Sequence, residues 1–181
     1  MKALKIFLAL LFLFLISTHQ GYSWEKKKTL KELTNSAPLI VLGKVVEVNS
    51  QFEEYLGQKD FIITYVKFSV QNFLKGTASD AILTIKVTGG QIGDKVIGGE
   101  RSFPFTKNEE ALLFLSPIEK NFYEIYSISG KLTAVNNNEE KYLDCSLLME
   151  DEVSKYGQES LLKSEGIINR IESHLAEKGG K

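Results

Sequence analysis

The chain has 181 residues, of which 25% are charged, and its 22 basic side chains nearly balance its 23 acidic ones, for a formal net charge of −1. This balance, without a broad basic stretch, excludes the electrostatic footprint that a nucleic-acid partner requires. Cys145 is the only cysteine, so no intramolecular disulfide can form and packing alone must hold the fold.

Residues 1–23 have the layout of a secretory signal peptide. Two early lysines precede an apolar run, Ile6–Ile16, and small residues at positions 21 and 23 mark a cleavage site before Trp24. The run has 11 residues, whereas a membrane-spanning helix needs roughly 20, so a permanent anchor is the less favoured interpretation. We therefore expect an exported protein that works in the periplasm or outside the cell. An exported chain without disulfides is typical of bacteria.

The segment 24–38 predicts one short N-terminal helix. Thr29 and Glu32 have the spacing of a capping box, in which each side chain accepts a hydrogen bond from the other residue's backbone amide. Pro38 disfavours helical backbone at the residue before it and is expected to end the helix.

The segment 39–138 carries a series of short strands separated by turn residues. Gly43 interrupts the first strand and indicates a bulge or a sharp bend. The last two strands are expected to form a hairpin around Ser129 and Gly130. The predicted strands are Leu39–Val48, Phe61–Leu74, Ile82–Thr88, Ser102–Phe105 at an edge, Ala111–Leu115, Tyr123–Ile128 and Lys131–Val135.

The segment 139–181 predicts a loop followed by an amphipathic helix that packs on the strands. Its apolar residues Leu161, Ile168, Ile171 and Leu175 recur at helical spacing. Taken together, these elements predict a mainly β fold of the α+β class. The expected architecture is a small OB-like antiparallel β-barrel, with a short helix before it and the amphipathic helix after it.

Seven short segments form a series that carries a family resemblance. They are Thr29–Leu33, Leu39–Val48, Tyr65–Val70, Phe73–Gly76, Gly89–Gly93, Glu109–Leu115 and Gly130–Leu132. The series resembles a widespread group of exported bacterial proteins of unknown function and covers roughly residues 29–135. The resemblance implies a barrel similar to the OB-folds of netrin-like and metalloproteinase-inhibitor modules. Those inhibitors present an N-terminal cysteine to zinc, whereas this chain offers Trp24, so zinc-chelating inhibition is not implied.

Candidate catalytic residues are scarce. His174 is the only histidine outside the predicted signal peptide, and Cys145 would need it as a base to act as a nucleophile. One histidine and one cysteine do not make a zinc site of three or four ligands without carboxylates. We expect His174 at a helix surface and Cys145 in a structural position, with no catalytic residue, no metal and no cofactor.

Acidic residues occur in clusters that are interpreted as solvated charges in turns. The clusters are Glu53-Glu54, Glu109-Glu110, Glu139-Glu140 and Glu150-Asp151-Glu152. A glycosidase would need two carboxyl groups facing each other across a cleft, which spacing along the chain does not show. The stretch 136–144 is rich in oxygen ligands but lacks the order and the central glycine of an EF-hand.

The most distinctive loop is Gly89–Gly99. It follows a strand, as a phosphate-binding loop does, but it lacks the closing Gly-Lys-Ser/Thr and the helix that would offer free amides. The loop is predicted to be a hairpin tip or a loop that contacts a ligand, together with Gln51–Lys59. The candidate ligand-binding residues are Gly89, Gly90, Gln91, Gly93, Phe52 and Tyr55, with further aromatic surface from Phe61, Tyr65, Phe103 and Phe105.

These observations predict a non-catalytic binding module whose partner is an envelope or extracellular protein or a glycan. Two alternatives stay open. A hydrolase of cell-envelope material would work through carboxylates. A membrane-surface assembly factor would use Lys26, Lys27 and Lys28, the only basic cluster outside the predicted signal peptide, against anionic lipids.

Overall fold

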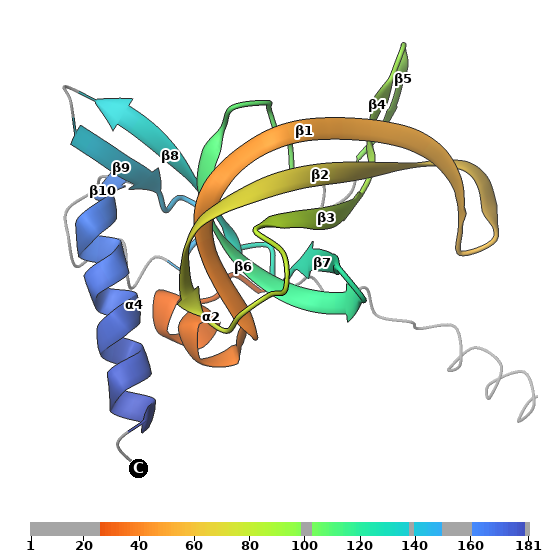
Figure 1. The fold of residues 1–181 in the computed structure, drawn as a ribbon. Coiled ribbons are helices and arrows are strands. Elements are labelled where there is room, and N and C mark those ends of the chain that lie inside the picture. The colour runs from red at the N-terminus through yellow and green to blue at the C-terminus, as the bar shows by residue number, and fades with distance from the viewer. Residues whose placement is uncertain (1–25, 99–102, 138–139, 150–160, 180–181) are drawn as a thin grey trace, which may run out of the picture.

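The computed structural model describes residues 26–98, 103–137, 140–149 and 161–179, so the predicted signal peptide, 1–23, lies outside the described residues. The described chain is mainly β, with one short helix before the strands and one longer helix at the end (Figure 1). This confirms the predicted class. The helices are α2 (Leu30–Ser36) and α4 (Ser164–Gly179). The strands are β1 (Leu39–Tyr55), β2 (Gln58–Lys75), β3 (Ile82–Thr88), β4 (Gly90–Ile92), β5 (Lys95–Ile97), β6 (Glu110–Glu119), β7 (Phe122–Ile125), β8 (Lys131–Asn137), β9 (Glu140–Asp144) and β10 (Leu161–Lys163).

The strand pairings form a circuit. They run from β1 through β2, β3, β7 and β6, and β6 pairs again with β1. All these neighbours are antiparallel except β3 and β7, which run parallel where Thr84 lies opposite Phe122. On its other edge β6 also pairs with β8, which continues the sheet through β9 to β10. The β4–β5 hairpin forms a small sheet of its own and projects from the molecule (Figure 1).

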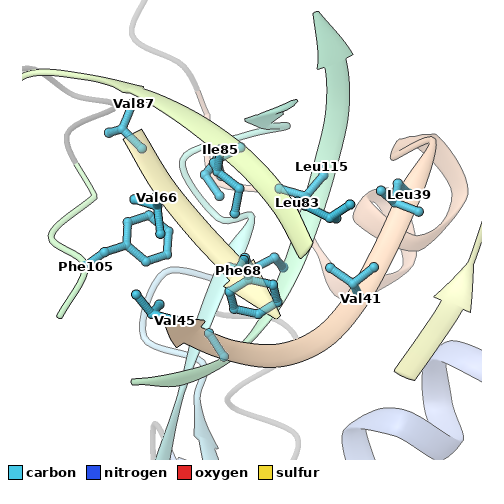
Figure 2. Close-up of a cluster of buried hydrophobic side chains, with 13 residues drawn as sticks. Leu39, Val41, Val45, Val66, Phe68, Leu83, Ile85, Val87, Phe105 and Leu115 are labelled. Atoms are coloured by element: carbon cyan, nitrogen blue, oxygen red, sulfur yellow. The ribbon is translucent and has the colours of Figure 1, made fainter. Parts of the chain in front are cut away.

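Two clusters of buried apolar side chains lie on opposite faces of the β1–β6 pair. Leu39 and Val41 enter the first cluster with Leu113 and Leu115, and Ile40 enters the second with Leu112 and Phe114. Figure 2 shows the first cluster, in which Phe68, Val66, Ile85 and Val87 extend from β2 and β3. The second cluster joins β6, β8 and β9 to the helices through Leu30, Leu33, Ile167 and Ile171.

The local signals of the sequence explain the ends and bends of several elements. The Thr29 hydroxyl accepts from the backbone N–H of Glu32, and the Glu32 carboxylate accepts from the backbone N–H of Thr29, so the predicted capping box begins α2. The register of β1 against β2 shifts between Leu42 and Gly43, which confirms the predicted bulge. Leu83, Ile85 and Val87 of β3 are buried, as their alternation predicts.

Four sequence expectations are wrong. The strands β7 and β8 do not form a hairpin with each other, because both pair with the same edge of β6, one after the other. Phe103–Phe105 is not a strand; Ser102 lies outside the described residues. The predicted loop after residue 139 contains β9 and β10, and Leu161 lies in β10 opposite Asp144 instead of in the helix.

The bulge leaves no room for a side chain at Gly43, and this can be tested. A Cβ atom there would lie 2.2 Å from the Ser69 carbonyl oxygen and 2.7 Å from Cε1 of the buried Phe68 ring. We expect Gly43→Ala to lower the free energy of unfolding by about 1–3 kcal/mol through overpacking, as measured by urea denaturation. The matched control is Gly166→Ala in α4, where a Cβ meets open space and a gain of about 0.5–1 kcal/mol is expected. Equal stability of the two variants would show that a Cβ at position 43 is accommodated without overpacking.

Candidate functional site

A half-open cleft of about 390 Å³ lies beside the predicted ligand residues. It lies where the first core cluster ends, between the β1–β2 ribbon, the β4–β5 hairpin and the segment 103–105. The described lining is apolar, hydroxyl, amide or glycine, and none of it is charged. It consists of Val48, Ser50, Thr64, Val87, Gly89, Gly90, Gln91, Val96, Ile97, Gly98, Phe103, Pro104 and Phe105.

A short hydrogen-bond chain forms the polar part of the cleft. Thr64 is buried, and its hydroxyl donates to the Gly89 carbonyl oxygen at 2.7 Å. The Ser50 and Thr64 hydroxyl oxygens lie 2.8 Å apart. Ser50 and Thr64 pair across β1 and β2, so their side chains share one face of the ribbon.

The glycines at the start of the β4–β5 hairpin let it approach this face. Gly90 has a φ of +144°, and a Cβ there would lie 2.2 Å from the Thr64 hydroxyl oxygen and 3.0 Å from that of Ser50. Gly89, Gly90 and Gln91 line the cleft, although the Gln91 side-chain amide turns away and donates to the Gly93 carbonyl at 3.0 Å. Gly93 is at the hairpin tip, outside the cleft, with a φ of +58°.

Phe52 and Tyr55 lie beside the cleft and do not line it, whereas Phe103 and Phe105, the predicted further aromatic surface, do. Phe52 is 48% exposed, and the ammonium of Lys95 lies 5.1 Å from the centroid of its ring. Because Lys95 belongs to β5, this contact joins the two predicted ligand segments; the Lys95 ammonium also donates to the Asp60 carbonyl at 2.8 Å. Tyr55 packs on the Phe61 ring at 5.0 Å and borders a smaller neighbouring cavity of about 80 Å³.

An ion pair between Glu109 and Lys131, which sequence reasoning missed, holds the wall of the cleft. The two side chains are 9% and 8% exposed, and the Lys131 ammonium lies 2.6 Å from the Glu109 carboxylate. It also donates to the Pro104 carbonyl and lies 4.1 Å from the centroid of the Phe105 ring. The reading of Glu109 as a solvated turn charge is therefore wrong. The only available signal was its position two residues before the apolar run Ala111–Leu115 of β6.

A second charged group, Glu53 on the β1–β2 ribbon, is part-buried and held by three partners. Tyr65 donates to the Glu53 carboxylate at 2.6 Å, Gln51 donates to it at 2.7 Å, and Lys86 lies 3.6 Å from it. The hydrogen bond from Tyr65, followed by the one from Gln51, lowers the pKa of Glu53. Burial and the hydrogen bond to Glu53 raise the pKa of Tyr65. Glu53 is therefore an ionised acceptor at neutral pH rather than a proton donor.

The groups that nucleophilic or metal chemistry would need lie elsewhere. Cys145 is buried in the second cluster, and its thiol lies 3.5 Å from the Leu143 carbonyl. His174 lines a groove between α2 and α4 with Lys31 and Glu177, and its buried Nδ1 has no hydrogen-bond partner among the described atoms. Within the described ranges, no three His, Cys, Asp or Glu side chains gather as a metal site would require. None of the helices described is long and apolar enough to cross a membrane.

The buried Glu109–Lys131 pair should matter far more than an exposed one. We expect Glu109→Gln to lower the free energy of unfolding by about 3–5 kcal/mol, because Lys131 then stays buried without its counter-charge. The matched control is Glu47→Gln, which breaks the exposed 2.7 Å pair with Lys67 and should cost less than about 1 kcal/mol. Chemical denaturation of both variants measures the difference. Similar small losses would show that the buried pair is solvated.

The hydrogen bond from Tyr65 to Glu53 predicts how the stability of the fold depends on pH. Since the pKa of folded Glu53 lies below its ordinary value of 4.5, its contribution to stability is complete above pH 4.5 and is lost as the pH falls through the folded pKa. Tyr65→Phe removes the largest cause, so the pKa of Glu53 should rise in an NMR titration of its carboxyl carbon. Tyr126→Phe, on the other side of β6, should leave it unchanged. An unaltered Glu53 pKa in Tyr65→Phe would refute the assignment.

The described lining of the cleft can bury apolar surface and exchange single hydrogen bonds with a neutral molecule. It offers no side chain that titrates near neutral pH, because its polar members are Ser50, Thr64 and Gln91. Compared with protein-family models, with curated proteins and with solved structures, the chain matches none.

Proposed function

We propose that the protein is an exported, non-catalytic binding module built on an OB-like barrel, and that its ligand enters the cleft beside the β4–β5 hairpin. The circuit of pairings through β1, β2, β3, β7 and β6 supports the barrel, because each of these strands pairs with two others of the circuit. The parallel pair of β3 with β7 amid antiparallel neighbours agrees with a Greek-key barrel of this kind. Residues 1–23 support export.

The observation that carries the binding role is the convergence of separate chain segments on one uncharged hollow. Strand residues from β1 and β2, the hairpin glycines and the segment 103–105 border it together. Its volume of about 390 Å³ falls within the roughly 300–1,000 Å³ of small-molecule sites. Val96 borders it while 67% exposed, so an entering molecule meets an apolar rim.

The electrostatics of the described residues favour binding over hydrolysis. Hydrogen bonds lower the pKa of Glu53, that of Glu140 through Lys163, and that of Glu177 through Lys31. An acid catalyst of a glycosidase needs the opposite shift. The unpartnered Nδ1 of His174 also differs from a triad histidine, whose second nitrogen is held by a carboxylate.

The membrane-surface alternative is less well supported because its lysines are partly engaged. The Lys27 ammonium donates to the Ser146 carbonyl at 3.0 Å, and the Lys28 ammonium lies 5.4 Å from the centroid of the Tyr126 ring. Of the three lysines, Lys26 alone has no such contact among the described residues. A polybasic membrane contact needs several free ammonium groups, each contributing about 1 kcal/mol.

The proposed cleft can be tested with one ring in three charge states. We expect benzyl alcohol to shift the amide NMR signals of Gly89 and Gly90 saturably, and benzoate and benzylammonium to bind at least about tenfold more weakly, because the described lining has no counter-charge. Val96→Glu at the rim should weaken benzyl alcohol binding. Val135→Glu on β8, also exposed but outside the lining, is the control. If neither variant changed the affinity for benzyl alcohol, the ligand would bind elsewhere and the proposal would be overturned.

A further inference from the structure

The hydrogen-bond chain in the cleft fixes the direction of its protons. A backbone carbonyl oxygen can only accept, so the single hydroxyl proton of Thr64 goes to the Gly89 oxygen at 2.7 Å. The Thr64 oxygen can then join the 2.8 Å contact with Ser50 only as an acceptor. The proton of that contact therefore comes from Ser50.

In this arrangement Ser50 can only accept a hydrogen bond from a bound molecule. Its only hydroxyl proton is used on Thr64, and its oxygen keeps lone pairs that can accept. Ser50 is part-buried and borders the cleft. A group bound there must offer an N–H or O–H donor, because a ligand oxygen in the same position would face another acceptor.

The other described lining residues determine the shape and polarity of the rest of the ligand. Val48, Val87, Val96 and Ile97 provide aliphatic walls, and Phe103, Pro104 and Phe105 provide flat ones. The volume of about 390 Å³ is more than twice the roughly 150 Å³ that holds benzene in an engineered apolar cavity. The cleft therefore has room for a group larger than one ring.

We propose that the cleft binds a neutral, largely apolar aromatic ring system that carries one hydrogen-bond donor, and that Ser50 Oγ accepts from that donor. The proposal rests on the proposed binding role and adds its ligand chemistry. Such a ring system can be a free indole-like or phenol-like molecule, or an aromatic side chain of a peptide. In either case burial supplies the affinity, and the Ser50 oxygen supplies the selectivity.

Three isosteric probes test the donor requirement: indole has an N–H, indene a CH₂ and benzofuran an ether oxygen at the same ring position. Calorimetric and NMR titrations of the purified protein should rank indole about twofold to tenfold tighter than indene, the effect of one neutral hydrogen bond. Benzofuran should bind more weakly than indene. Ser50→Ala should bring indole and indene to equal affinity, whereas Ser79→Ala, at an exposed serine outside the lining, should preserve the ratio.

A second variant tests the proton direction itself. Thr64→Val removes the acceptor of the Ser50 proton, so Ser50 becomes free to donate and benzofuran should gain on indole relative to the native protein. A capped, uncharged tripeptide with central tryptophan distinguishes the source of the ring. Binding at least as tight as indole indicates a peptide side chain, and exclusion indicates a free ring.

Equal affinities of indole and indene in the native protein, or failure of indole to bind, would overturn the donor requirement. If benzyl alcohol still shifts Gly89 and Gly90 and responds to Val96→Glu, the binding role stands without this ligand class. If it does not, both proposals fail. An indole-to-indene ratio that persists in Ser50→Ala would also overturn the inference, because the donor would then be recognised by another group.

Discussion

The structure depends most on the antiparallel pairing of β1 with β6, which is buried on both faces. Leu39 lies opposite Leu115 and Leu42 opposite Leu112, and alternate residues of the pair enter the two hydrophobic clusters. A slip of one residue would exchange the two sets, so both clusters fix the same register. Since α2 and α4 pack on the second cluster and β2 and β3 build the first, the position of each of these four elements depends on this pair.

The β1–β6 pair also determines where the cleft lies, through the continuation of β1 and through the segment that precedes β6. Beyond the residues that contact β6, β1 continues beside β2 as far as Ser50 and past it. Directly before β6, Glu109 binds Lys131 of β8, and this pair holds the segment of Phe105 over the end of the first cluster, beside Val45 and Val66 (Figure 2). Two walls of the cleft are thus the continuation of β1 and the segment that leads into β6, and the β4–β5 hairpin forms the third.

Sequence reasoning succeeded where the determining interactions are local. The alternation in β3, the apolar run at the start of β6 and the capping box at Thr29 each depend on residues a few positions apart. It failed where a distant partner decides. The segments on either side of Ser129 and Gly130 could pair with each other or with β6. Glu109 could be solvated or buried, depending on Lys131 far along the chain. The hairpin glycines were singled out, yet Ser50 and Thr64 were not, because two hydroxyls in a strand carry no distinguishing pattern.

The two glycines and the two hydroxyl groups nevertheless form one connected arrangement. The backbone N–H of Gly89 donates to the Ile62 carbonyl at 2.8 Å, and the Gly89 carbonyl accepts from the Thr64 hydroxyl, so both backbone groups of Gly89 bond to strand β2. Gly90 follows with a φ that L side chains rarely adopt, so the chain can leave β3 without displacing either hydroxyl. The carbonyl then orders the protons of Thr64 and Ser50 in one direction. The polarity presented to a ligand is therefore set by backbone geometry, and it can be altered by exchanging one hydroxyl while the β1–β6 pair and both clusters stay intact.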